Sequence, residues 1–375
     1  MQFICLQENL AKGLQIAKQS GVQKTTLPIL QNFLITQEQG MLMVTSTNLD
    51  IGIKAYIRGK EDGENEKFTS QSVTIPQDKL FSYVKNLPQN KTYLTLSEHH
   101  LRVDSGEDFA ADFQGISAEE FPELPEVQEE YSLTLDSQEL KQALKRASVS
   151  LPKNDYRPEI AGVYIAKKEQ ELVITGTDGF RLSETKLQIP SIDSDDFQFT
   201  IPQKTIAECT RILDIVDDEE VSLLFSQDRL KIQLGHVEIT STLIEGKFPQ
   251  YEALIPQSFT RELLLDKKTL IQAIKLSSVF TTDSVNDVKI QGVSETHIAI
   301  SSSHDEIGNN KSQVPTDMTG DYQFEITFNY TYLLDGIQSC QSEEITLALN
   351  DSDSPAILRG KDDKQFLYLV MPIRD

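Results

Sequence analysis

The chain of 375 residues contains no tryptophan, only three cysteines and five histidines, and no apolar run of the roughly 18 residues that a transmembrane helix needs. The cysteines, Cys5, Cys209 and Cys340, are too far apart for a C-x-x-C pair or a zinc site, and they predict no disulfide framework. The first residues, MQFICLQENLAKG, lack the basic region and apolar core of a signal peptide. We therefore expect a reducing, cytoplasmic compartment.

Motifs of catalysis and metal binding are also missing from the sequence. The histidines occur in neither H-E-x-x-H nor near G-x-S-x-G, and no P-loop is present. Acidic runs at 193–196 and 217–220 lack the glycine and closing glutamate of an EF-hand, so we interpret them as solvated loops. The sequence thus predicts no catalytic residue, no metal and no cofactor.

Positive charge is scarce, because 35 Lys and Arg stand against 58 Asp and Glu, for a net charge of −23. A simple nucleic-acid-binding protein is expected to be basic, so the total argues against one. With 38% hydrophobic and 25% charged residues, the composition is that of a folded globular protein and excludes a disordered chain. The distribution of the charge therefore matters more than its sum.

The chain contains three similar segments spaced 130 residues apart: CLQENLAKGLQIAK at 5–18, LDSQELKQALKRAS at 135–148 and LDKKTLIQAIKLSS at 265–278. Small or apolar residues at i, i+4 and i+7 predict an amphipathic helix in each copy. These positions are Leu10, Leu14 and Ala17; Leu140, Leu144 and Ala147; and Leu270, Ile274 and Ser277. An internal repeat is therefore the first feature of the fold.

A second helix recurs 126 residues apart, as IPQDKLFSYVKNL from Ile75 and IPQKTIAECTRIL from Ile201, with a weaker copy, TFNYTYLLDGIQS, from Thr327. Pro76 and Pro202 are predicted at the first helical position, where proline's missing N–H costs nothing. We expect the three copies to place one residue each at a common core position: Leu80, Ile206 and Tyr332.

Between the helices the period changes to alternation, as in FLITQEQGMLMVTS, YIAKKEQELVITG and RLKIQLGHVEITSTLI, which predicts antiparallel strands. The segments FPELP at 121–125 and FPQYEALIP at 248–256 close two units. The predicted fold is α+β, with three similar domains at 1–128, 129–257 and 258–375, each with two helices on antiparallel sheets.

Positive charge is concentrated on the repeated helices, since five of the six helical segments with their flanks are net basic although the chain is acidic. Ordinary solvated helix faces would explain any one of them. Five together indicate a surface that follows phosphates by sequence-independent, salt-sensitive contacts.

Seven segments, taken together, resemble the bacterial sliding clamp family, the beta subunits of DNA polymerase III, over the whole chain. They are LPILQNFLI (27–35), STNLDIGIKA (46–55), ISAEEFPELP (116–125), RPEIAGVYI (157–165), TGTDGFRLSE (175–184), LIEGKFPQYEALIP (243–256) and YLVMPIRD (368–375). The resemblance implies a head-to-tail homodimer that forms a six-domain ring with twelve inner helices. With helices about 8–10 Å apart, the hole would be roughly 35 Å across, enough for a DNA duplex.

The function that this resemblance implies is that of a non-catalytic processivity factor. The ring would encircle duplex DNA and tether the replicative polymerase, the clamp loader and other factors with a clamp-binding motif, in the bacterial cytoplasm at the nucleoid. In the family, these partners insert a short peptide between the second and third domains. The matching positions are Ile160, Thr177, Gly179, Phe180, Arg181, Leu182, Pro249, Leu254, Val370, Met371, Pro372, Ile373 and Arg374.

The resemblance also implies a DNA-facing set and a dimer interface. The positions that match DNA-facing ones are Lys24, Lys79, Lys85, Lys153, Asn154, Arg157 and Lys204. The interface residues are Phe109 on one side and Val279 with Phe280 on the other. Phe180 stands where the family often has histidine, and Ala253 where some members have arginine, so we expect a more apolar peptide site.

Two other classes of function remain open from the residues alone. One is an enzyme with a site centred on Asp178, which would need a base nearby. The other is a three-domain interaction protein that binds no DNA. The basic helices and the C-terminal MPIR favour the clamp over both.

Overall fold

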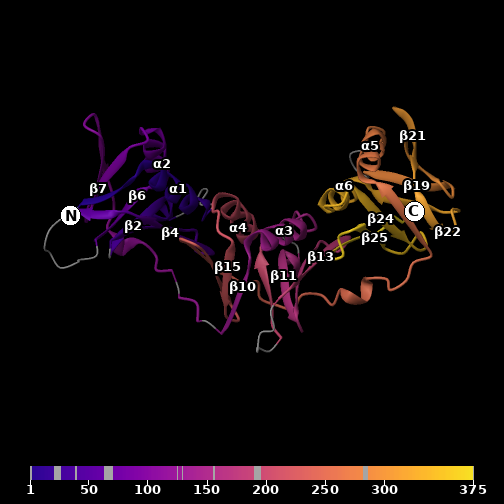
Figure 1. Ribbon diagram of the computed structural model, residues 1–375, viewed down its shortest axis with the longest axis horizontal. Helices are drawn as coiled ribbons and strands as arrows, with labels where there is room; N and C mark the ends of the chain where they lie inside the picture. Colours follow the sequence, from indigo (N-terminus) through magenta and orange to yellow (C-terminus); the bar gives the residue numbers. More distant parts are fainter. Residues whose placement is uncertain are drawn as a thin grey trace. The chain divides into compact units, whose positions relative to one another are not determined.

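The computed structural model describes residues 2–20, 27–38, 40–62, 71–124, 126–128, 130–154, 157–189, 196–281 and 286–374 (Figure 1). The chain divides into two compact units. The first consists of residues 1–141 and 204–243, and the second of 142–203 and 244–375.

The first repeat has two α-helices, each preceded by a strand. Its elements are β1 (Gln2–Leu6), α1 (Gln7–Ala17), β2 (Asn32–Glu38), β3 (Met41–Thr47), β4 (Ile51–Arg58), β5 (Lys60–Asp62), β6 (Gln71–Pro76), α2 (Gln77–Asn86), β7 (Lys91–Ser97), β8 (His100–Ser105) and β9 (Phe109–Gln114). Short 3₁₀ turns are η1 (Lys18–Ser20), η2 (Pro28–Gln31) and η3 (Ala118–Glu120).

The second repeat follows the same order. Its elements are β10 (Tyr131–Asp136), α3 (Ser137–Ser148), η4 (Pro158–Ile160), β11 (Gly162–Lys168), β12 (Glu171–Thr177), β13 (Arg181–Gln188), β14 (Gln198–Pro202), α4 (Gln203–Ile215), β15 (Glu220–Phe225), β16 (Arg229–Leu234), β17 (Val237–Thr242) and η5 (Glu252–Leu254).

The third repeat completes the pattern. Its elements are β18 (Arg261–Asp266), α5 (Lys267–Ser278), β19 (Asp287–Ser294), β20 (His297–His304), β21 (Gly308–Pro315), β22 (Asp317–Gly320), β23 (Glu325–Asn329), α6 (Tyr330–Ser339), β24 (Glu344–Leu349), β25 (Ala356–Gly360) and β26 (Phe366–Val370). The helices and strands predicted from the repeats are confirmed. The strand that opens each repeat was not predicted.

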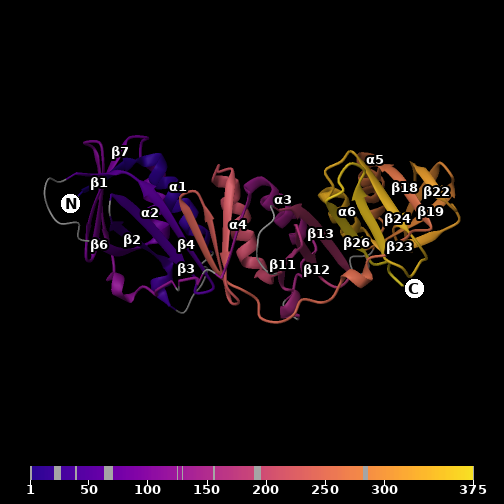
Figure 2. The same ribbon diagram turned by 60° about the horizontal axis from the view of Figure 1, so that its bottom comes forward.

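Two of the sheets continue from one repeat into the next. In the first unit, β17 pairs with β4 and so builds one eight-stranded sheet, β10-β15-β16-β17-β4-β3-β2-β6. In the second unit, β13 pairs with β26 and builds a nine-stranded sheet, β14-β11-β12-β13-β26-β25-β24-β18-β22 (Figure 2). A five-stranded sheet, β5-β1-β7-β8-β9, and a four-stranded sheet, β21-β20-β19-β23, complete the two units.

The helices pack their predicted stripes into the cores. In α1, Leu10, Leu14 and Ala17 are at most 1% exposed. The helix packs against α2 and against β4, which it approaches closely at Gly13. A Cβ atom at Gly13 would lie 2.6 Å from the Ile57 side chain, so a larger residue there would require that side chain to shift.

Two details of the second helix differ from the prediction. Pro76 ends β6 and is the N-cap of α2, with an extended ψ of 120°, so the helix begins one residue later than expected; α4 likewise begins after Pro202. The core residue of α6 is Leu333, which is 1% exposed, whereas Tyr332 is half-buried. The weak third copy is displaced by one residue, because α6 begins at Tyr330 directly after its cap, Asn329.

No helix of the described residues is long and apolar enough to cross a membrane. Among the same residues, no three His, Cys, Asp or Glu side chains come together in a way that could hold a metal ion. Residues 193–195 of the first acidic run lie outside the described residues.

Candidate functional site

The segment from Thr177 to Arg181 forms a tight turn between β12 and β13. The Thr177 hydroxyl donates to the Arg181 carbonyl at 2.7 Å, and Asp178 Oδ1 accepts from the amides of Phe180 and Arg181 at 2.9 and 3.0 Å. Gly179 has a φ of +90°, which explains a glycine at this position. The turn holds the Phe180 side chain in solvent, 64% exposed.

The C-terminal strand brings the end of the chain to this turn. β26 pairs with β13, so that Arg181 lies opposite Val370 and Leu182 opposite Leu369. The Met371 amide then donates to the Phe180 carbonyl at 2.8 Å. The two sequence segments predicted to form one site, TGTDGFRL and YLVMPIR, are therefore in contact through the main chain.

A second apolar cluster covers the other face of this strand pair, here called the outer face, where Leu182 and Leu369 are each 3% exposed. Leu182, Leu369 and Met371 belong to one cluster with Phe248 and Tyr251 from the segment before η5. The Phe248 ring stacks on Tyr164 with 4.5 Å between ring centroids. The Tyr251 hydroxyl donates to Glu184 at 2.6 Å and accepts from the Thr175 hydroxyl at 3.0 Å. These bonds fix the 248–254 segment over the sheet, where Pro249 is half-buried and Leu254 is 61% exposed.

The opposite face of the strand pair carries a buried polar cluster. Arg181 is 4% exposed; its Nε donates to Asp178 at 2.9 Å and its Nη1 to Asp335 of α6 at 2.5 Å. The guanidinium stacks on the Tyr332 ring at 4.3 Å. Burial disfavours the charge, but Tyr368, Asp335 and Asp178 together raise the pKa of Arg181. Arg181 therefore links the second repeat to α6 of the third.

The predicted peptide-site residues thus separate onto two faces. Val370 is fully buried in the core of the third repeat, together with Tyr368, whereas its neighbour Leu369 is on the outer face. Leu369, Phe248 and Tyr251 were not among the residues predicted from the sequence. Strand alternation would have found Leu369, because residues 369 and 371 share a face.

The remaining predicted residues surround the turn to different degrees. Ile160 is 1% exposed, and its amide donates to the Arg157 carbonyl at 3.1 Å. Pro372 is buried, Ile373 is tied to Thr327 by a 2.8 Å main-chain bond, and Arg374 is exposed.

Among the predicted DNA-facing residues that the structure describes, four lysines and Asn154 are exposed: Lys79 and Lys85 on α2, Lys204 on α4, and Lys153 after α3. None of the four lysines forms an ion pair with a described residue. Lys24 lies outside the described residues. Arg157 pairs with Glu159 at 3.2 Å, and its guanidinium lies beside Gly179, close to the peptide site.

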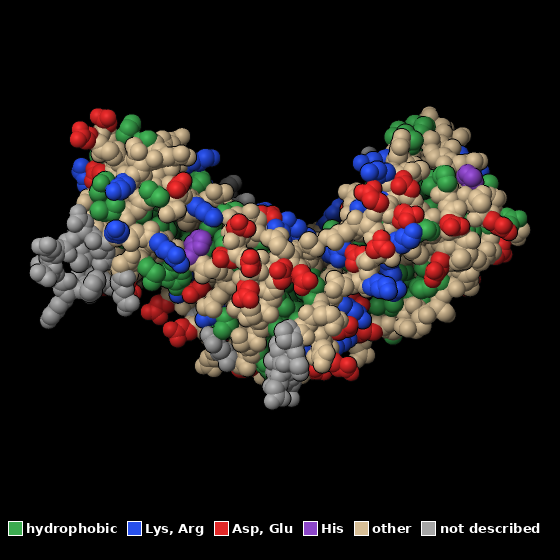
Figure 3. Space-filling model, in the orientation of Figure 1, with side chains coloured by type: hydrophobic (Ala, Val, Ile, Leu, Met, Phe, Trp, Pro, Cys, Tyr) green, Lys and Arg blue, Asp and Glu red, His purple; other side chains and the backbone are tan. Residues whose placement is uncertain are grey.

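The local charge pattern also has an acidic part. On α2, Asp78 forms a 2.7 Å ion pair with Lys18, so these two charges cancel. On the face shown in Figure 3, acidic side chains occur in groups with lysine and arginine side chains between them. The free lysines of the helices are therefore a local feature on an acidic molecule.

The predicted interface residues lie next to edge strands. Phe109, 49% exposed, begins β9, which pairs only with β8 among the described strands. In the other unit, Val279 is 64% exposed, and the Phe280 ring lies near Gly308 at the start of β21, which pairs only with β20 in the described part of the chain. Each edge offers unpaired main-chain groups to another strand.

Asp178 does not have the environment of a catalytic base. Its Oδ1 accepts from two amides of the turn and its Oδ2 from Arg181. Both oxygens are therefore occupied in holding the turn, which argues against an enzyme centred on this residue.

Comparison with known proteins gives consistent results along the chain. Residues 1–125, 134–250 and 252–374 match the N-terminal, central and C-terminal domains of the DNA polymerase III beta subunit. The chain is 28% identical to the beta sliding clamp of Synechococcus elongatus (100% of this chain, 99% of the relative) and 26% identical to that of Bacillus subtilis (100% of each).

Solved structures agree with these matches. A sliding clamp from Pseudomonas aeruginosa bound to griselimycin superposes with a TM-score of 0.93 at 26% identity, over 100% of both chains. The Bacillus subtilis clamp gives 0.90 at 25% identity, over 100% of this chain and 99% of the other. The chain belongs to the family of DNA polymerase III beta subunits, the beta sliding clamps.

Proposed function

We propose that two copies of this chain close head to tail into a ring that encircles duplex DNA, and that the ring tethers the polymerase and other partners through the outer apolar face of the β13–β26 pair. The chain is then an accessory subunit of a polymerase, with no reaction of its own. The observation that carries the proposal is the junction of the Thr177–Arg181 turn with the C-terminal strand.

The peptide surface in this proposal has a fixed floor and two exposed apolar side chains. Leu182, Leu369 and Met371 form the floor, held by the strand pair and by the anchored Tyr251. Phe180 and Leu254 are the exposed large apolar side chains of the predicted set. An apolar peptide anchor buried here would provide most of the binding energy. Arg181 and Val370 act behind this surface by holding it in shape.

The test of the peptide surface is fluorescence anisotropy with a labelled peptide that carries a Gln- and Leu-containing clamp-binding motif. We expect Phe180→Ala with Met371→Ala to weaken binding by on the order of tenfold or more, since two apolar contacts are lost. The matched control is Leu49→Ala, an apolar side chain exposed to 56% at the corresponding turn of the first repeat. Equal affinity of the double variant and the wild type would reject this surface.

The DNA contact is proposed to come from exposed, unpaired helix lysines. Replacing Lys79, Lys85 and Lys204 by glutamine should reduce the salt dependence of duplex binding, because each lost phosphate contact lowers the slope of log K against log salt by about 0.9. The control is Lys361→Gln, a lysine paired with Glu344 at 2.6 Å. An unchanged slope in the triple variant would exclude these helices from the DNA contact.

Ring closure is proposed between the β9 edge of one copy and the β21 edge of another. Light scattering should give about twice the monomer mass at micromolar concentration. Phe109→Arg should shift the protein toward monomer, because a charge would be buried in the interface, whereas Met41→Arg, at a side chain 43% exposed on β3, should not. A wild type that stays monomeric would contradict the ring.

Two finer proposals accompany the ring. We propose domain boundaries at 1–128, 129–257 and 258–375, supported by the repeated element order, although the shared sheets tie each domain to the next. We also propose a bacterial cytoplasmic location, at the nucleoid during replication, because duplex DNA is the proposed track. Imaging of a fluorescent fusion in replicating cells tests the location.

A further inference from the structure

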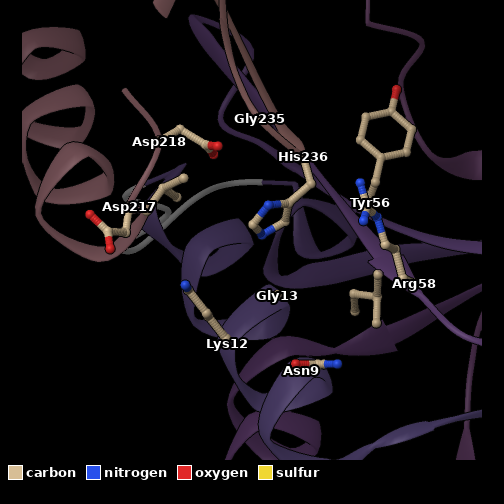
Figure 4. Close-up of a pocket in the computed structure, with 11 residues that line it drawn as sticks. Asn9, Lys12, Gly13, Tyr56, Arg58, Asp217, Asp218, Gly235 and His236 are labelled. Carbon is tan, nitrogen blue, oxygen red and sulfur yellow. The ribbon is translucent and has the colours of Figure 1, made fainter. Parts of the chain in front are cut away.

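A pocket of about 470 Å³ lies in the first unit, where the sheet passes from the first repeat to the second (Figure 4). α1 contributes Asn9, Lys12 and Gly13 to its lining, and β4 contributes Tyr56, Ile57 and Arg58. The other side is formed by the β16–β17 turn, Gly235–His236, and by the segment 216–218 after α4. None of these residues belongs to the sites proposed above.

Three nitrogen-bearing side chains converge on this pocket. Figure 4 shows His236 between Lys12 and Arg58. Neither Lys12 nor Arg58 forms an ion pair or side-chain hydrogen bond with a described residue. Lys12 is half-buried and Arg58 is exposed at the rim, so an anion placed between these two unpaired cations would interact favourably with both.

Two aspartates also line the pocket, and their positions limit what they neutralise. A Cβ atom at Gly235 would lie 1.9 Å from Asp218 Oδ2, so this carboxylate rests against the turn and not on either cation. Asp217 points away from His236 and Lys12 in Figure 4. Lys12 lowers the pKa of His236 more than Asp218 raises it, and Arg58 lowers this pKa further.

The second unit shows how the corresponding place is neutralised there. Arg146 lies on α3, the helix that repeats α1, one turn beyond the position that aligns with Lys12. It forms a buried ion pair with Asp363 in the β25–β26 turn. That turn spans residues 361–365, whereas the equivalent β16–β17 turn is only Gly235–His236 and carries no carboxylate. The protein thus pairs a buried arginine with a carboxylate at one junction, whereas at the other neither Lys12 nor Arg58 forms an ion pair with a described residue.

We propose that the pocket between α1, β4 and the β16–β17 turn binds a phosphate group, held by Lys12, Arg58 and His236. A phosphate fits better than a single carboxylate, because its several oxygens can accept from all three side chains at once. The volume is large enough for a mononucleotide. Free phosphate, a nucleotide and a DNA backbone share this chemistry, and the experiment separates them.

Binding should be linked to the protonation of His236. In the free protein, burial, Lys12 and Arg58 lower the pKa of His236, while Asp218 raises it in part. Asp217 is the other charged group that lines the pocket, and the nearby Tyr56 hydroxyl donates to Glu238 at 3.1 Å. A bound anion would favour the imidazolium, so affinity should rise as pH falls.

The experiment is NMR of the His236 imidazole in the full-length protein, titrated separately with inorganic phosphate, a deoxynucleoside monophosphate and a short linear duplex. We expect saturable shifts of His236 that Lys12→Gln with Arg58→Gln weakens by on the order of tenfold or more. The matched control is Lys361→Gln with Lys364→Gln, two exposed lysines of the β25–β26 turn that lie outside the pocket and outside the proposed DNA contact. The pH arm measures the binding of sulfate, whose charge is constant, by isothermal titration calorimetry, and His236→Gln should remove the pH dependence of that binding.

Each of the three probes tests a different source of the phosphate group. Shifts with phosphate or the nucleotide identify a small-molecule site. Shifts with the duplex alone identify a contact to the DNA backbone. The proposal is overturned if none of the three probes shifts His236 at millimolar concentration, or if the shifts are the same in the Lys12 and Arg58 variant as in the control. Failure of this site would leave the ring and the peptide surface untouched, because neither uses these residues.

Discussion

The two junctions where a sheet passes from one repeat to the next have the same backbone arrangement. They differ in whether their basic side chains are paired with carboxylates. The β17–β4 and β13–β26 pairs both begin beside a turn with the same hydrogen bonds: Thr47 and Asn48 hold the first, and Thr177 and Asp178 hold the second. At the second junction, buried arginines pair with Asp335 and Asp363. At the first, Lys12 and Arg58 line an open pocket. A repeated backbone can therefore carry two different chemistries.

The largest expected effect concerns Arg181. Arg181→Ala leaves Asp178, and partly Asp335, without a counter-charge, and should lower the free energy of unfolding by about 3 kcal/mol. Urea denaturation monitored by circular dichroism measures the loss. Lys268→Ala, at an exposed lysine of α5 paired with the exposed Glu343, should cost less than about 1 kcal/mol. Equal losses would show that Arg181 does not link the repeats.

The next prediction compares the junctions directly. Arg146→Ala removes the buried partner of Asp363 and a guanidinium stacked 4.5 Å above the Phe366 ring, and should cost about 2 kcal/mol. Lys12→Ala at the first junction should cost less than about 0.5 kcal/mol, since Lys12 has no partner to lose among the described residues. Thermal unfolding of both variants in phosphate-free buffer tests this difference. A greater loss for Lys12→Ala would reverse the comparison.

The pH dependence should differ between the junctions through His236. Because the pKa of His236 is lowered in the folded protein, its contribution to stability is present above the unfolded value of about 6.5 and is lost as pH falls below it. His236→Gln should therefore make stability less dependent on pH below about 6.5. Differential scanning calorimetry at several pH values measures this effect, with the exposed His99→Gln as the control. A steeper dependence in His236→Gln would contradict the sign.

The smallest expected change in stability concerns Leu49, in the turn between β3 and β4 of the first repeat. Leu49 has a φ of +79°, where the second turn has Gly179, and its side chain is 56% exposed. Leu49→Gly should relieve about 1–2 kcal/mol of left-handed strain but lose about 0.5–1 kcal/mol to backbone entropy, for a net gain near 0.5 kcal/mol. Gly179→Leu should lower the stability by a similar amount. Chemical denaturation of the two variants is the measurement, and a clear loss in Leu49→Gly would show that the leucine makes a stabilising contact.

Much of the architecture was predictable because local patterns repeat. The stripe at Leu10, Leu14 and Ala17 recurs at two further places, and periodicity alone identifies these residues as a core face. The third copy of the second helix was displaced by one residue, because TFNYTYLLDG offers apolar side chains at both Tyr332 and Leu333. Only the position of the Asn329 cap decides between them.

The sequence predicted which segments form the candidate site, but not on which face of the sheet each side chain lies. The sequence and its family resemblance pointed to the Thr177–Leu182 segment and to the C-terminus, and β-pairing brings them together. They did not tell that Arg181 and Val370 face inward while Leu182 and Leu369 face outward, because a strand covered on both faces has no polar side to mark. The pocket at Lys12 was invisible for a different reason, since its residues come from four separate segments.

The sequence by itself determined the threefold repeat, the α+β composition of each repeat and the basic bias of the helices, since these depend on periodicity and charge within one segment. The tertiary structure decided which strands join the repeats, which arginines are neutralised and which lysines remain unpaired. Those outcomes depend on partners more than 100 residues away, such as Asp363 for Arg146. A charge acquires its role from the distance and burial of its counter-charge, and only the folded chain sets both.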